Sequence, residues 1–288
     1  MDKNQLNQFL LKAQQDPETA KQLAEIMKRV VEAYDRARPA VQLVAERFAA
    51  MLEKIRPALQ ELQKWWIEFH PNLVRLVEAA KAMPPAYRKA LMELGQRGWY
   101  LDGEMALSTP FEFARAISEG RIEETEVALE DHFTTRLDAI ESEIATAFPS
   151  RARILAAAFR AHKDGLYACS IPVFLTQMDG ICMEVGNKYF FIKENKRPGI
   201  AGHVDQLSDN PLTAAMLAPL TEILPISAGP EARGPGFWQL NRHTVIHGES
   251  VDYDTRRNSL RAISLINYVS QMLSQPKLAL IQAPPSSP

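Results

Sequence analysis

The sequence predicts an all-α fold, in which an extended N-terminal helical region is followed by a helical bundle. Apolar residues recur every three or four positions over most of the chain, which is the spacing of one helix face. Glycines and prolines fall mainly between these periodic stretches, where helices start and stop. The one segment in which we expect a strand is "KYFFI", residues 188–192. Helices are therefore expected almost throughout.

Composition is that of an ordinary globular protein, with 46% hydrophobic and 24% charged residues among 288. No stretch approaches the ~20 consecutive apolar residues that span a bilayer. The start, "MDKNQLNQFLLKAQQDPE", lacks the basic and apolar regions of a secretory signal. The two cysteines, Cys169 and Cys182, cannot form a disulfide framework and lack zinc-site spacing. These features predict a cytoplasmic protein with buried thiols and no membrane association.

The charge balance neither demands nor excludes a nucleic-acid partner. The net charge is −2, but residues 1–149 carry 19 Lys and Arg against 24 Asp and Glu, and residues 150–288 carry 14 against 11. A strongly basic domain would indicate nucleic-acid binding, and this chain has none. If the protein binds a nucleic acid, the C-terminal part is the better place for it.

Residues 1–149 form the expected helical region, whose role the sequence does not give. Pro39 and Pro57 are predicted to end or kink helices. Trp65 and Trp66 are adjacent and cannot both face one core, so one of them is expected to meet another segment or another chain. These N-terminal helices are the expected surface for a regulatory protein partner.

Three further helices are expected before residue 150. The first should run over residues 84–95, and the second over 108–120, where Ser or Thr followed by Pro is typical of a helix start. The third, residues 121–148, is long and polar, and its charges are interpreted as a solvated face. Pro149 then marks the predicted boundary between the two regions.

Residues 150–280 form the predicted helical bundle, and residues 281–288 a disordered tail. An apolar helix with Pro172 in its early turns is central to this bundle. Between the helices we expect loops at 187–210, apart from the short strand, and a Gly/Pro-rich connector at 225–236. The predicted helices span residues 150–164, 166–186, 211–224 and 255–273.

The stretch "NRHTVIHGES", residues 241–250, gathers the groups that can carry chemistry. His243 and His247 lie four positions apart, which places both on one helix face, as in zinc helices. However, Thr244 stands where a zinc protease has its glutamate, and a third ligand would have to come from elsewhere, such as Glu249. A metal site is therefore one interpretation of the stretch, but not the favoured one.

A metal-free pair is the second interpretation. Arg242 and His247 are about 140° apart on a regular helix, but Gly248 ends the helix, and there His247 can turn back toward the arginine. Histidine exchanges protons near neutral pH, and arginine binds a phosphate through parallel hydrogen bonds. Such a pair suits RNA cleavage, because the ribose 2′-hydroxyl supplies the nucleophile and no cofactor is required.

A third interpretation is purely structural. Arg242 would pair with Asp179 or Glu249, and His247 would be a polar helix end before Gly248. Three residues just after the stretch are open to the same alternatives, since they suit either a phosphate-binding rim or a solvated first helical turn. They are Arg256, Arg257 and Asn258.

The segment "LNRHTVIHGESVDYDTRRNSLRAISLINYV", residues 240–269, resembles the C-terminal part of the HEPN superfamily, which is built around an R-x(4–6)-H motif. The helix "YACSIPVFLTQMDGI", residues 167–181, is similar to the apolar helix that packs beside that motif. The resemblance covers roughly residues 150–275 and is poor over 187–235.

The resemblance implies a HEPN-like helical bundle that pairs with a second copy, so that two motifs face each other. Active members are metal-independent endoribonucleases of toxin, abortive-infection and CRISPR systems, and many others are non-catalytic binding or dimerisation modules. By position, Arg242 would bind phosphate, His247 would be the general acid/base, and His243 would orient one of them or the RNA. An acidic residue on an earlier helix would be Asp179, with Glu184 beside it. Asn241 and Glu249, which flank the motif, complete the candidate set.

Overall fold

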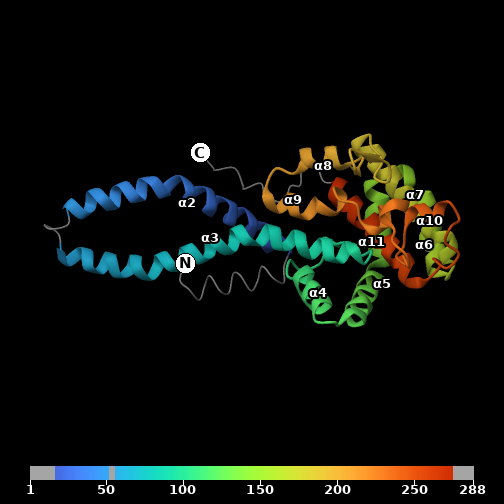
Figure 1. Cartoon of the computed structure of the whole chain (residues 1–288), viewed down its shortest axis with the longest axis horizontal. Helices are drawn as coiled ribbons and strands as arrows, with labels where there is room; N and C mark the ends of the chain where they lie inside the picture. Colours follow the sequence, from blue (N-terminus) through green and yellow to red (C-terminus); the bar gives the residue numbers. More distant parts are fainter. Residues whose placement is uncertain (1–16, 52–55, 275–288) are drawn as a thin grey trace. The chain divides into compact units, whose positions relative to one another are not determined.

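The computed structural model describes residues 17–51 and 56–274, and it confirms the all-α fold (Figure 1). The described residues divide into two compact units between Pro85 and Ala86. We call residues 17–85 the N-terminal unit and residues 86–274 the C-terminal unit. None of the described helices is both long and apolar enough to cross a bilayer. The side chains of Trp65 and Trp66 and the tail 281–288 lie outside what the structure describes.

The N-terminal unit contains α2 (Pro17–Met51) and the first part of α3 (Arg56–Gln96). Lys81 Nζ lies 3.4 Å from Asp35 Oδ1 and joins the two helices. α2 continues through Pro39, whereas Pro57 is the second residue of α3, where its missing N–H costs nothing. The expectation that a new helix begins at Pro84 is wrong, because α3 runs through that proline.

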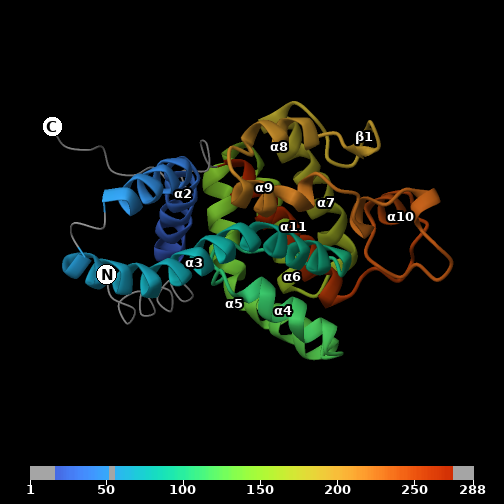
Figure 2. The same cartoon turned by 60° about the vertical axis from the view of Figure 1, so that its left-hand side comes forward.

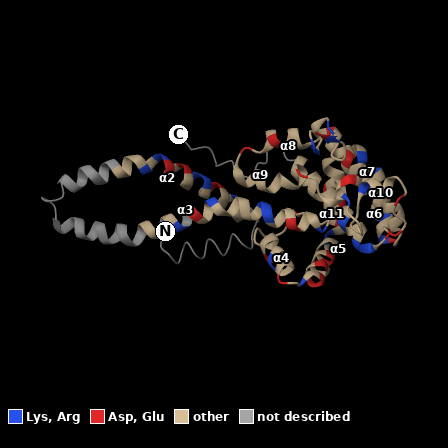
Figure 3. Ribbon diagram, viewed as in Figure 1, with Lys and Arg blue, Asp and Glu red and all other residues tan. Residues whose placement is uncertain are grey.

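The C-terminal unit contains the last turns of α3, a set of shorter helices and one small hairpin. The boundary expected at Pro149 falls inside this unit, where Pro149–Arg151 form a single 3-10 turn between two helices. Acidic and basic residues both occur along its helices, and acidic residues gather on α5 (Figure 3). Its elements are α4 (Thr109–Ser118), α5 (Ile122–Ala147), α6 (Ala152–Lys163), α7 (Tyr167–Gly186), β1 (Lys193–Glu194), β2 (Arg197–Pro198), α8 (Ala201–Leu207), α9 (Pro211–Leu217), α10 (Arg242–Ile246) and α11 (Arg256–Ser274).

The prediction of a strand at residues 188–192 is wrong. The backbone N–H groups of Phe190 and Phe191 donate to Asp179 Oδ1, at 2.7 and 3.2 Å, so this segment is fixed by a side chain rather than by a partner strand. The two-residue strands β1 and β2 follow it, and their turn places Asn195 and Lys196 at φ of 52° and 64°. α8 lies in the expected loop and is too short to show a periodic pattern.

α11 forms the centre of the C-terminal unit. The apolar stripe that the sequence predicts is buried. The remaining residues between Ser259 and Ser270 are all buried as well. Figure 2 shows α11 running among α5, α6 and α7. A helix that is buried on all sides needs partners for its polar side chains, because an unpaired buried polar group is costly.

Arg261 of α11 finds its partner on α5. Its Nη2 donates to both carboxylate oxygens of Glu126, at 3.0 and 2.9 Å, and the Trp99 indole N–H donates to the same carboxylate at 2.6 Å. Glu126 is only 3% exposed, so the interpretation of the α5 charges as a solvated face is wrong at this position. The partner of Glu126 is 135 positions away in sequence, and local periodicity carries no signal of it.

Asp102 fixes the loop between α3 and α4. Its carboxylate accepts hydrogen bonds from Arg136 Nε and Gln271 Nε2, and it lies 3.0 Å from His132 Nε2. Burial alone would raise the pKa of Asp102, but hydrogen bonds, led by those of His132 and Gln271, outweigh burial and hold that pKa well below its usual range. The loop is thereby fastened to α5 and α11.

His162 of α6 is a buried, neutral histidine. Its Nδ1 lies 2.7 Å from Ser259 Oγ, which is in turn 2.9 Å from Ser170 Oγ, so α6, α7 and α11 meet in one polar chain. Burial lowers the pKa of His162 to about 4, and the charges of Arg256 and Lys163 act in the same direction. The protonated form is therefore excluded from the folded protein near neutral pH.

We predict an acid-sensitive stability that depends on His162. Below its unfolded pKa of 6.5 the unfolded chain takes up a proton at this residue, while the folded chain does not until about pH 4. The free energy of unfolding should fall by about 1.4 kcal/mol for each pH unit between these values. Urea denaturation of wild type and His162→Gln between pH 6.5 and 4.5 measures this slope.

The His162→Gln protein should show a flatter slope over that range, because glutamine does not titrate. Equal slopes for wild type and His162→Gln would contradict the prediction.

Candidate functional site

The short helix α10 carries the candidate motif, and Asn241 fixes where it begins. The side-chain Oδ1 of Asn241 accepts the Thr244 N–H at 3.1 Å, as an N-cap residue does. Its Nδ2 donates to the carbonyl oxygens of Pro225 and Ala228, at 2.6 and 2.9 Å. Asn241 is 1% exposed. It therefore attaches α10 to the preceding connector and has no access to a ligand.

The C-terminal end of α10 follows the sequence prediction. The helix stops at Ile246, His247 occupies the C-cap position, and Gly248 takes a φ of 71°. That left-handed conformation suits glycine and is the reason the helix ends here. As a result, His247 is exposed at the helix end, whereas Val245 points into the core.

His243 and His247 are packed together on this end of the helix. Their ring centroids lie 4.3 Å apart. His243 Nε2 is 3.0 Å from Glu249 Oε1, and Arg233 Nη1 donates to Glu249 Oε2 at 2.9 Å. Hydrogen bonds and charge from Arg233 lower the pKa of Glu249, and His243 adds to this shift. Two imidazoles, one carboxylate and one guanidinium thus form a connected cluster, which we call the α10 cluster.

Arg242 points away from this cluster. Its guanidinium lies over the Phe191 ring, with Cζ 5.5 Å from the ring centroid, and its buried Nε has no hydrogen-bond partner in the described structure. The contacts among the described residues include none between Arg242 and His247. The predicted turning back of His247 toward the arginine is therefore not seen, because His247 packs on His243 instead.

The Asp179 carboxylate contacts the backbone of the same phenylalanine. It is 8% exposed, and its Oδ1 accepts both the Phe190 and Phe191 N–H groups. Burial raises the pKa of the Asp179 carboxyl, while these hydrogen bonds and the charge of Arg242 oppose the shift. Asp179 and Arg242 thus both hold Phe191, one through its backbone and the other over its ring.

The remaining candidates are engaged in structural contacts. Glu184 pairs with Arg151 Nε at 3.0 Å, within a network that fastens the turn before α6 to α7. Arg256 donates to Glu130 at 2.9 Å, and Arg257 pairs with Glu123 and Glu130 on α5. These α5 glutamates explain why two arginines begin α11, where the helix dipole disfavours positive charge.

Two residues that contact the candidate site residues could not be predicted from the sequence. Arg233 comes from the Gly/Pro-rich connector and Phe191 from the segment expected to be a strand, and neither carries a local signal of its role. Cys169 is exposed, contrary to the expectation of two buried thiols. No group of three or more His, Cys, Asp or Glu in the described part of the chain is arranged to hold a metal ion.

No family model matches the chain, and no curated protein or solved structure matches it either.

We predict that Asp179 matters for folding through its oxygen rather than its charge. Asp179→Asn keeps a carbonyl oxygen for the Phe190 and Phe191 N–H groups and should change stability little. Asp179→Ala leaves the buried Phe190 N–H unpaired, at a cost of about 1–3 kcal/mol, and also removes the acceptor of the part-buried Phe191 N–H. Urea denaturation of the two variants beside wild type measures the difference, and equal losses for both would contradict it.

Proposed function

We propose that the C-terminal unit is a HEPN-like domain that binds RNA at the α10 cluster and cleaves it without a metal ion. The observation that carries the proposal is the exposed imidazole of His247 packed at 4.3 Å against His243, which Glu249 holds at 3.0 Å. An exposed histidine that is oriented by a second ring and a carboxylate is well placed to transfer protons. The resemblance of residues 240–269 to HEPN proteins supports the same proposal.

In the proposed reaction, His247 accepts the proton of a ribose 2′-hydroxyl. The 2′-oxygen attacks the adjacent phosphorus, and the bond from phosphorus to the 5′-oxygen breaks. The departing 5′-oxygen takes a proton from an imidazolium, which leaves a 2′,3′-cyclic phosphate and a 5′-hydroxyl. In this proposal Arg242 binds the phosphate through its terminal Nη groups, since its Nε is buried.

We propose further that two copies act together. In the α10 cluster each copy offers one exposed histidine, His247, and the reaction requires one group to accept a proton and another to donate one. A two-fold axis beside α10 would bring two clusters face to face. Side chains around α10 suit such an interface, since Val251 is 90% and Trp238 63% exposed.

A second candidate function is a non-catalytic interaction module of HEPN type. Arg242 and His247 do not meet, and Glu249 is already paired with Arg233 and His243. In this alternative the exposed Trp238 and Val251 mark a docking surface for another protein, and the α10 cluster only fixes the loop. The resemblance alone suggests the setting, which is a toxin or phage-defence system, and a regulatory protein on the N-terminal helices is a separate part of the proposal.

We predict that His247→Ala abolishes cleavage while the protein stays folded. His247 is exposed at a helix end, so its loss should cost less than about 1 kcal/mol of stability. Removing a general acid/base should lower the rate about 10²- to 10⁴-fold. RNA cleavage and a thermal melt are measured on one preparation, with His70→Ala of the N-terminal unit as the matched histidine control. Full cleavage by a folded His247→Ala protein would contradict the assignment.

Cleavage should also survive chelation. The proposed chemistry uses only imidazole and guanidinium groups, so excess EDTA should leave the rate of wild-type cleavage unchanged. The measurement is a time course with and without EDTA, followed by addition of zinc or manganese. Loss of cleavage that either metal restores would revive the metal site built on His243 and His247.

Full activity should require a homodimer whose interface includes residues 237–250. Val251→Glu places a charge beside that surface and should weaken association without touching the core, because Val251 is almost fully exposed. Light scattering at micromolar concentration gives the mass, and the same samples are assayed for cleavage. A fully active monomer would contradict the two-copy arrangement.

A further inference from the structure

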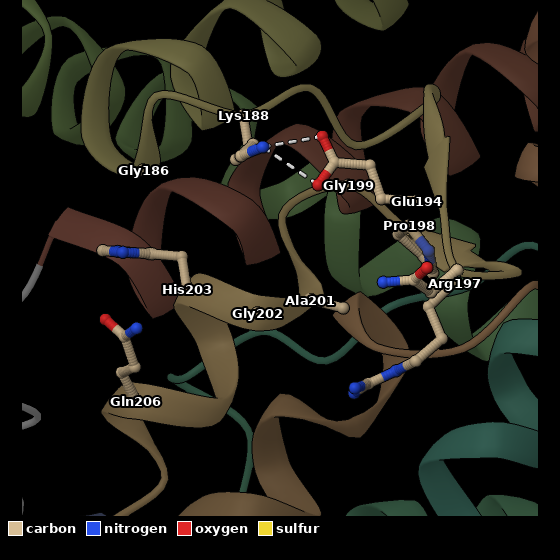
Figure 4. Close-up of a pocket in the computed structure, with 11 residues that line it drawn as sticks. Gly186, Lys188, Glu194, Arg197, Pro198, Gly199, Ala201, Gly202, His203 and Gln206 are labelled. Atoms are coloured by element: carbon tan, nitrogen blue, oxygen red, sulfur yellow. Dashed lines mark hydrogen bonds and ion pairs between the residues drawn. The ribbon is translucent and has the colours of Figure 1, made fainter.

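A polar cavity lies between the end of α7, the β1–β2 hairpin and α8, away from the α10 cluster. Its volume is about 380 Å³. Figure 4 shows the side chains around it, which come from three separate segments. The lining residues with polar or charged side chains are Lys188, Glu194, Asn195, Arg197, His203 and Gln206.

The backbone around the cavity is built from close approaches that need glycine. A Cβ on Gly199 would lie 2.6 Å from the carbonyl oxygen of Tyr189 and 2.9 Å from that of Ile192. A Cβ on Gly186 would lie 2.3 Å from Ile200 Cδ1 and 3.0 Å from the His203 ring. These two glycines let the hairpin and α8 close against the end of α7, and this fixes where His203 lies.

Positive charge exceeds negative charge among the lining residues. Lys188 Nζ donates to both carboxylate oxygens of Glu194, at 2.8 and 2.9 Å. Arg197 donates to both oxygens of Asp205, at 2.8 and 3.0 Å, but Asp205 does not line the cavity. Lys188, Glu194 and Arg197 are each about half exposed, so a solute can reach them.

Three further polar side chains complete the lining. The side chains of His203, Asn195 and Gln206 have no hydrogen-bond or ion-pair partner within the described residues. Figure 4 shows His203 and Gln206 on successive turns of α8, on the side of the cavity opposite Arg197. The cavity therefore offers the cationic groups of Lys188 and Arg197 together with uncommitted amide and imidazole groups.

We propose that this cavity binds a small phosphate monoester. A phosphate monoester is dianionic near neutral pH and has three acceptor oxygens, which match Lys188, the remaining N–H groups of Arg197 and the His203 ring. The volume lies within the range of small-molecule sites and leaves room for an organic group beside Asn195 and Gln206. The proposal is independent of RNA cleavage at α10.

Glu194 is the anion that holds Lys188 when no ligand is bound. An incoming phosphate competes with this carboxylate for the ammonium group. Neutralising Glu194 should therefore strengthen binding, whereas neutralising Lys188 should weaken it. These opposite effects of two neighbouring substitutions separate a specific site from a general attraction of anions to the surface.

The test is a calorimetric titration of the full chain with ribose 5-phosphate, with ribose at equal ionic strength as the control. We expect saturable one-to-one binding with a Kd below about 1 mM. Lys188→Ala should weaken it at least about tenfold, as the loss of a charge-assisted contact does, and Glu194→Gln should tighten it. His203→Ala should weaken it without changing the thermal melt.

Lys196→Asn is the matched control. It removes a lysine from the turn of the same hairpin, but Lys196 does not line the cavity, and asparagine tolerates its φ of 64°. Its Kd should stay within about twofold of wild type, since exposed charges are screened. Absence of saturable binding, equal binding of ribose, or equal losses in Lys196→Asn and Lys188→Ala would overturn the proposal.

Discussion

The burial of α11 from Ser259 to Ser270 is the constraint on which the C-terminal unit depends. Because no side of this helix faces water between Ser259 and Ser270, each neighbouring helix supplies partners to it. Glu126 of α5 binds Arg261, and the Ser170–Ser259–His162 chain joins α7 and α6 to it. The loop after α10 leads directly into α11, so the candidate site is joined to a helix that its buried contacts hold in place.

One carboxylate relates the two sites that we propose. Asp179 fixes the backbone at Phe190 and Phe191, immediately after the end of α7. The Phe191 ring lies under Arg242, while Lys188, three positions earlier, lines the cavity. Residues 188–191 therefore take part in both proposed sites. Asp179 fixes the backbone of this segment without lining the cavity itself. Asp179, which the resemblance implied as a supporting acidic residue of the site, is therefore better understood as a positioning residue.

Helix ends at glycines could be predicted from the sequence, because they depend on local backbone conformation. Contacts between residues far apart in the sequence could not be predicted. Glycines at 120, 165 and 248 take positive φ where the sequence placed helix ends. The apolar stripe of α11 was also evident, but not that its polar side is buried, because Glu126 lies far away in sequence. At the candidate site, the sequence predicted that α10 ends beside Gly248. It could not give the partner of His247, which depends on how two rings and the distant Arg233 pack together.

The central claim is that RNA binds at the α10 cluster, and the most direct measurement is of the histidine ring signals themselves. A protein with ¹³C-labelled histidines is titrated with RNA whose 2′-hydroxyls are methylated, so that binding occurs without cleavage. The account predicts that the His243 and His247 signals shift together and saturate, while the buried His162 signal stays in place. Saturating shifts confined to other histidines, or none at all, would contradict it.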